Sequence, residues 1–103
     1  MLKKRLHTDK MIEPELLAND LKRIFDENSI MEEQIGDTTV FVMEKYFLRN
    51  NNYASCTICM KQNETGTELV LFGNGAGSGL WNITFGATED MMDGIENVIQ
   101  KYL

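Results

Sequence analysis

The chain has 103 residues, of which 43% are hydrophobic, and a formal net charge of −6. This length suits one hydrophobic core, so we expect a single domain over residues 1–103. The charge is uneven, because the first ten residues carry +3 and the remaining residues carry −9. An acidic body repels phosphate, and one short basic cluster is too little to hold nucleic acid at physiological salt, which excludes nucleic acid as an expected partner.

The basic start of the chain does not continue as an export signal. Lys3-Lys4-Arg5 is followed by His7, Thr8, Asp9 and Lys10 instead of an apolar run. No stretch approaches the ~20 apolar residues of a membrane-spanning helix. We therefore expect a cytoplasmic protein with no membrane partner.

The first third of the chain predicts one strand and one helix. Residues 2–8 can form a short strand, but their three consecutive charges fit a frayed terminus equally well. Pro14 suits the first position of a helix, and apolar residues recur at helical spacing as far as Phe25, so we expect a helix from about Pro14 to Glu27. The next segment, Ile30 to Ile35, is compatible with either a short strand or an irregular connection.

Residues Thr38 to Arg49 read as a long strand rich in Val, Phe and Tyr. Both of its faces are apolar: one holds Val40, Val42, Tyr46 and Leu48, and the other holds Phe41, Met43 and Phe47. One layer of helices buries only one face, so we expect the other to meet a partner or a pocket. The three asparagines that follow predict a hairpin turn.

The next strand, Tyr53 to Gln62, contains both cysteines of the chain. Its alternation turns Ala54, Cys56, Ile58 and Met60 inward. Residues three apart on a strand point to opposite faces, so Cys56 is expected inside and Cys59 outside, both reduced. With His7 as the only histidine, we expect no metal site.

A glycine-rich stretch lies between the next two predicted strands, Thr67 to Phe72 and Leu80 to Phe85. Its glycines occupy alternate positions: Gly73, Gly75, Gly77 and Gly79. The dinucleotide-binding spacing fails, and no lysine between Lys61 and Lys101 could complete a phosphate-binding loop. We interpret the stretch as a mobile connection between strands. The alternative is a loop that contacts a ligand.

The C-terminal segment predicts a helix that begins after Gly86-Ala87, with Thr88 as its N-cap and acidic residues in its first turns. Its apolar residues recur at steps of three and four: Met91, Met92, Ile95, Val98, Ile99, Tyr102 and Leu103. Together the elements predict an α+β fold with two layers. In it, an N-terminal and a C-terminal helix cover one face of an antiparallel meander of four to five strands.

The run from Gly73 to Asp90 resembles the end of small bacterial domains of unknown function. In those domains a glycine-rich turn leads into an aromatic strand, a glycine and an acidic helix start, as Gly79, Trp81, Gly86 and Glu89 do here. The resemblance covers about the last third of the chain. It implies a small intracellular bacterial protein and assigns no site.

Three classes of function stay open. The first is a non-catalytic binding or self-association module, in which two copies form a symmetric homodimer through the outer face or edge of the sheet. The second is a carrier of a small apolar ligand between sheet and helices, with walls formed by Trp81, Phe85, Met91 and Met92. An enzyme comes last, because no spacing pairs two carboxylates for acid and base work, and no cofactor or catalytic residue is expected. A monomer remains the competing outcome if Ile30 to Ile35 or the N-terminal segment folds over the free face.

Overall fold

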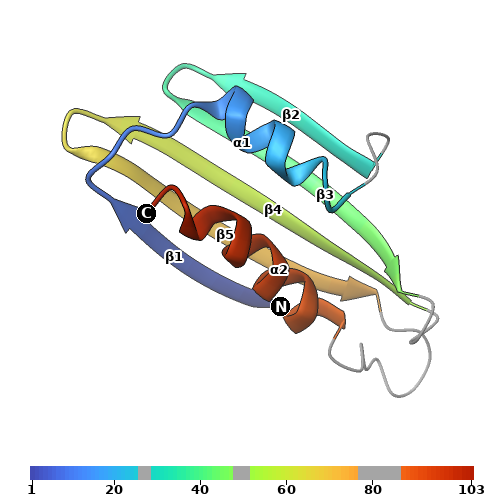
Figure 1. Ribbon diagram of the computed structural model, residues 1–103. Coiled ribbons are helices and arrows are strands. Elements are labelled where there is room, and N and C mark those ends of the chain that lie inside the picture. Colours follow the sequence, from blue (N-terminus) through green and yellow to red (C-terminus); the bar gives the residue numbers. More distant parts are fainter. Residues whose placement is uncertain (26–28, 48–51, 77–86) are drawn as a thin grey trace.

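The computed structural model describes residues 1–25, 29–47, 52–76 and 87–103. Its elements, in chain order, are β1 (Leu2–Thr8), α1 (Pro14–Leu21), β2 (Ile30–Ile35), β3 (Thr38–Phe47), β4 (Asn52–Asn63), β5 (Gly66–Ala76) and α2 (Ala87–Gln100). The strands form one sheet in the order β1-β5-β4-β3-β2, and every neighbouring pair is antiparallel. Strands β2 to β5 make a meander, and β1 adds to its edge beside β5 (Figure 1).

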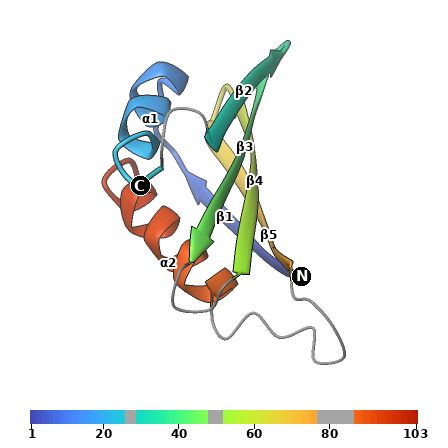
Figure 2. The ribbon, with the colours of Figure 1, turned by 90° about the vertical axis from the view of Figure 1, so that its right-hand side faces the viewer.

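Both helices lie on the same face of the sheet (Figure 2). Helix α2 contacts β4, β5 and α1. The chain leaves β1 at one edge of the sheet, passes through α1, and begins β2 at the opposite edge. This arrangement confirms the predicted two-layer α+β fold with its N-terminal and C-terminal helices on one face.

Two elements end at residues other than those the sequence predicts, and one open alternative is decided. Helix α1 ends at Leu21 instead of Glu27, because the amides of Arg23 and Ile24 bond to carbonyls three residues back and close a tighter turn. The ambiguous segment Ile30–Ile35 is an edge strand. Strand β5 continues to Ala76, so the first half of the glycine stretch is strand paired with β4, not a connection. The predicted strand Leu80 to Phe85 lies outside the described residues.

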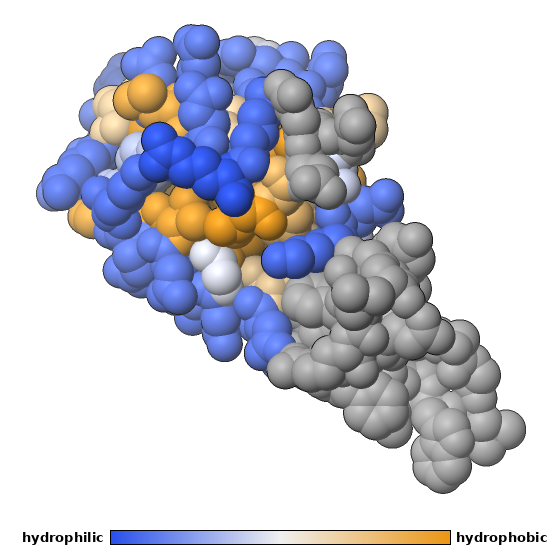
Figure 3. All heavy atoms as spheres, turned by 45° about the vertical axis from the view of Figure 1, so that its right-hand side comes forward, coloured by the Kyte–Doolittle hydropathy of each residue, from blue (hydrophilic) through white to orange (hydrophobic). Residues whose placement is uncertain are grey.

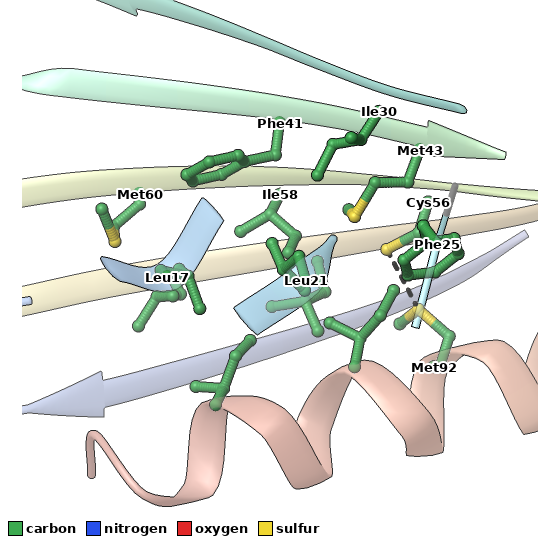
Figure 4. Close-up of a cluster of buried hydrophobic side chains, with 14 of the residues drawn as sticks. Leu17, Leu21, Phe25, Ile30, Phe41, Met43, Cys56, Ile58, Met60 and Met92 are labelled. Atoms are coloured by element: carbon green, nitrogen blue, oxygen red, sulfur yellow. Dashed lines mark hydrogen bonds between the residues drawn. The ribbon is translucent and has the colours of Figure 1, made fainter. Parts of the chain in front are cut away.

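The core lies between the sheet and the two helices, and Figure 4 shows its side chains converging from both layers. The inward side chains of the central strands are fully buried, among them Phe41, Ile58, Met60 and Leu71, and helix α1 adds Leu17 and Leu21. Phe41 and Met43 therefore point to the helices, and Val40 and Val42 point away from them. The inward direction predicted for Ala54, Cys56, Ile58 and Met60 is confirmed.

Helix α2 approaches the sheet most closely at Gly73. A Cβ built on Gly73 would lie 2.8 Å from Met92 Sδ and 3.0 Å from Thr88 Cγ2. Met92 Sδ also lies 3.7 Å from Cys56 Sγ, the contact dashed in Figure 4. The helix can rest here because the residue beneath it has no side chain.

Thr88 is not the N-cap that the sequence predicts. It is the second residue of α2, its methyl group lies over Gly73, and its buried Oγ1 has no hydrogen-bond partner among the described residues. Packing of the threonine methyl against the sheet decides its orientation, and capping does not.

A polar cluster ties α1 to the C-terminal end of the chain. The Asp20 carboxylate accepts a hydrogen bond from the Tyr102 hydroxyl, lies 2.5 Å from Lys101 Nζ, and lies 3.6 Å from an Arg23 guanidinium nitrogen. The hydrogen bonds from Lys101 and Tyr102 hold the pKa of Asp20 below its ordinary value. Burial and the neighbouring carboxylate raise the pKa of Tyr102 to about 12.

Because its pKa is lowered by folding, Asp20 contributes stability above its ordinary pKa of about 4, and this contribution is lost as the pH falls through the lowered value. We therefore expect the wild type to lose stability more steeply below about pH 4 than Asp20→Asn does. Urea unfolding of both proteins at a series of pH values measures the difference. Parallel stability curves for the two proteins would show that folding does not lower the pKa of Asp20.

Candidate functional site: the outer face of the sheet

The candidate site is the face of the sheet opposite the helices, which we call the outer face. The strand register arranges its side chains in three rows that each cross all five strands. In order from β1 to β2, the rows are Lys3, Phe72, Thr57, Val42 and Met31; Arg5, Val70, Cys59, Val40 and Glu33; and His7, Glu68, Lys61, Thr38 and Ile35. Alternation along each strand puts these residues opposite the buried core positions.

The outer face exposes large apolar side chains. Met31 is 73% exposed, Ile35 68%, Val42 46% and Phe72 36%, and half-buried Val40, Val70 and Cys59 lie between them. Neither Ile30–Ile35 nor the N-terminal segment folds over these side chains, because the two segments are the edge strands of the same sheet. No described helix lies on this face (Figure 2). This exposed apolar surface makes the outer face the candidate site.

The two edges of the outer face carry charges of opposite sign, and between them the third row holds Glu68 and Lys61 on neighbouring strands. On β1 the outward positions are Lys3, Arg5 and His7, and on β2 the only outward charge is Glu33. The middle row therefore runs from a guanidinium through three half-buried side chains to a carboxylate. Lys4, on the inner side of β1, instead lies 2.6 Å from Glu96 of α2 and belongs to the packing of that helix.

The two cysteines lie on opposite sides of β4, as the alternation predicts. Cys56 is buried, and burial raises the pKa of its thiol to about 12, which keeps it protonated and unreactive at neutral pH. Cys59 is half-buried near the centre of the outer face. Among the described residues, no group of three or more His, Cys, Asp or Glu side chains is placed to hold a metal ion.

The residues expected to line a carrier pocket are only partly described. Met91 and Met92 are buried in the core at 4% and 6% exposure, where they fill the space between sheet and helix. Trp81 and Phe85 lie outside the described residues, as do Gly77 and Gly79. Gly73 and Gly75 belong to β5. Carriage of a ligand therefore stays a prediction.

Two hollows adjoin the described surface. The smaller, about 220 Å³, is lined by Ser29, Met31, Val42, Met43, Glu44 and Ser55 at the β2 side of the outer face. It is below the usual size of a small-molecule site. The larger, about 550 Å³, lies between the segment before α1 and the β2–β3 turn, and its charged lining residues are the carboxylates of Glu13 and Asp37. Its other polar lining residues, Gln34, Thr39, Gln62 and Tyr102, are uncharged, and two surface carboxylates beside them do not define a ligand.

The helix-bearing side also exposes some apolar surface. Figure 3 shows hydrophobic side chains in the middle of this side and hydrophilic ones around them. On α1 and just after it, Leu16 and Ile24 are 55% and 36% exposed. The outer face differs from this side in two respects: its apolar groups lie in register on hydrogen-bonded strands, and opposite charges lie at its two edges.

Sequence reasoning had identified Val40 and Val42 but had not singled out Phe72, Val70, Met31 or Ile35. The signal for Val70 and Phe72 was present, since they alternate with Leu69 and Leu71 on one strand. Met31 and Ile35 could be placed only once their segment was known to be a strand.

The fold and this face define a small α+β domain with a five-stranded antiparallel sheet and two helices on one side. The chain belongs to DUF6054, a family of unknown function, whose profile matches residues 7–103. Membership of an uncharacterised domain family, expected from the last third of the sequence, thus extends over nearly the whole chain. No curated protein and no solved structure matches it. Neither described helix is both long and apolar enough to cross a membrane.

Proposed function

We propose that this protein is a non-catalytic binding module that works by self-association, with two copies paired through the outer face as a symmetric dimer. The observation that carries the proposal is the contiguous apolar face of Met31, Ile35, Val42 and Phe72, which no described helix covers. Bacterial origin and a cytoplasmic location remain predictions that accompany it. Carriage of a small apolar ligand is the alternative, and the core positions of Met91 and Met92 give it no support.

The size of the face suits a dimer of moderate affinity. Five strands spaced about 4.8 Å apart span about 24 Å, and seven residues of strand span about 23 Å. The projected area is then about 550 Å² per copy, and side-chain relief adds to it. Stable interfaces bury about 800 Å² per partner, so we expect dissociation in the micromolar range.

A charge placed in the apolar part of the outer face should abolish the dimer. Val42→Glu buries a carboxylate in the apolar part of the interface without a counter-charge, and we expect it to sediment at the monomer mass of 11.8 kDa. The matched control is Leu16→Glu, which adds the same charge at an exposed leucine of α1 and should leave the dimer intact. Circular dichroism establishes that each variant is folded.

Sedimentation equilibrium of the wild type decides the proposal. A mass of 11.8 kDa throughout the micromolar range would overturn it. Labelling of thiols supplies a second reading, because the dimer covers Cys59 while Cys56 is buried in either state. Labelling of Cys59 should therefore slow as the protein concentration rises.

A further inference from the structure

We infer that the two copies pair about an axis parallel to the strands, so that β1 of each copy lies over β2 of the other and Arg5 meets the partner's Glu33. The inference rests on the proposed function and specifies its geometry. Two facing sheets lie about 10 Å apart with their strands nearly aligned. A two-fold axis between them runs either along the strands or across them, and the two choices bring different side chains together.

An axis along the strands, centred on β4, reverses the strand order of the partner. The order β1-β5-β4-β3-β2 then faces β2-β3-β4-β5-β1, and each row faces the same row of the partner. In the first row Phe72 meets Val42 of the second copy. In the middle row Val70 meets Val40, and Cys59 lies near the axis. Apolar groups are thus matched around the axis, whereas at the edges Lys3 lies over Met31 and His7 over Ile35 of the second copy.

An axis across the strands keeps Val70 and Val40 over apolar groups and brings Met31 over Ile35, but it matches Phe72 and Val42 poorly. Each strand then faces its own copy, and rows on either side of the axis exchange. Phe72 would meet Glu68 of the second copy, and Val42 would meet Thr38. Burying Phe72 against a carboxylate loses the gain from apolar contact and desolvates a charge.

The edge charges select the same arrangement. With the axis along the strands, the β1 residues Lys3, Arg5 and His7 lie over the β2 edge of the partner, whose outward charge is Glu33. With the axis across the strands, the basic edge would lie over a second basic edge. Opposite charges across an interface favour one register, and like charges disfavour the other. The two Arg5 to Glu33 pairs lie at the rim, where long side chains accommodate the usual 30° angle between packed sheets.

One pair of like charges remains near the axis in this arrangement. Lys61 of β4 faces the same residue of the partner, but it is exposed at the end of the outer face and lies beside Glu68 on the neighbouring strand. Its ammonium group can reach solvent while its aliphatic stem covers apolar surface. Lys61 therefore does not oppose the arrangement.

Charge reversal tests the geometry. Arg5→Glu creates two Glu to Glu contacts per dimer, and Glu33→Arg creates two Arg to Arg contacts, so each should raise the dissociation constant at least about tenfold. The double variant Arg5→Glu with Glu33→Arg restores both pairs and should dissociate within about threefold of the wild type. The controls, Lys22→Glu and Glu15→Arg, make the same changes in net charge at exposed positions of the helix side and should have little effect.

Sedimentation equilibrium of these variants separates failure of the geometry from failure of the proposed function. If the wild type dimerises but the double variant is weaker than either single variant, or the single variants match their controls, the axis is wrong while self-association stands. A wild type that remains monomeric overturns both. Only restored dimerisation of the double variant supports the arrangement in which β1 lies over the partner's β2.

Discussion

Gly66→Ala is expected to destabilise the protein more than alanine at Gly36, Gly73 or Gly94 does. Gly66 has φ of 140°, a conformation that only glycine adopts readily, and a Cβ there would lie 2.0 Å from the Thr8 carbonyl oxygen and 2.7 Å from Asp9 Cα. Both contacts are with backbone at the end of β1, so no side chain can rotate away. Relief requires β1 to separate from β5.

The conformation alone costs about 1–3 kcal/mol, and displacing an edge strand adds to it, so we expect a total loss of about 4 kcal/mol or more. That is a large share of the roughly 5–15 kcal/mol that stabilises a domain of this size. The midpoint of urea unfolding measures the loss. The matched control is Gly36→Ala in the β2–β3 turn, where φ is 60° and nothing lies within 4 Å of an added Cβ.

For Gly36→Ala we expect a loss of only about 1 kcal/mol, which is the cost of the left-handed conformation. The difference between the two alanine variants therefore combines the contact with β1 and the greater conformational cost at Gly66. Equal midpoints for the two would show that the β4–β5 turn can move away from Thr8 without loss. They would also show that β1 is not held at this end of the sheet.

The sequence was sufficient to predict the class of fold, but not to predict which segments form the sheet and how they pair. Alternation identified β4, whose inward residues are apolar, and a composition rich in Val, Phe and Tyr identified β3. Strand β2 stayed ambiguous, because edge positions tolerate charge on both faces: Glu32 and Glu33 point to opposite sides and both are exposed. The pairing of β1 with β5 joins residues about 65 positions apart, and no local pattern specifies such a contact.

The face of β3 that meets the helices was likewise not predictable from the sequence. Both of its faces are apolar, so alternation alone could not decide whether Phe41 or Val42 meets the helices. The structure decides it through the register with β4, whose inward side chains Ile58 and Cys56 pair with Phe41 and Met43. The outer face as a continuous surface exists only after all five strands are in order. Its charge separation depends on β1 and β2 lying at opposite edges.

In the glycine stretch, Gly73 allows α2 to pack on the sheet, although the glycines around it suggest a loop that contacts a ligand. Gly73 lies under α2 because a side chain at this position would enter the space of Met92 and Thr88. Met92 is flexible at its sulfur end, whereas the contacting methyl carbon of the β-branched Thr88 lies only two bonds from the helix backbone. The size of the residue at position 73 should therefore set how closely α2 packs.

Graded substitutions of Gly73 should lower stability in steps. Gly73→Ala requires Met92 to shift and brings a Cβ to 3.0 Å from Thr88 Cγ2, which should cost about 1 kcal/mol. Gly73→Val adds two methyl groups beyond that Cβ and should cost about 3 kcal/mol, the upper range for overpacking a core. Gly94→Ala within α2 is the control. Nothing lies within 4 Å of its added Cβ, so it should instead stabilise the helix by about 0.5–1 kcal/mol. Urea unfolding measures all three, and a valine variant as stable as the wild type would show that α2 does not depend on close contact with β5.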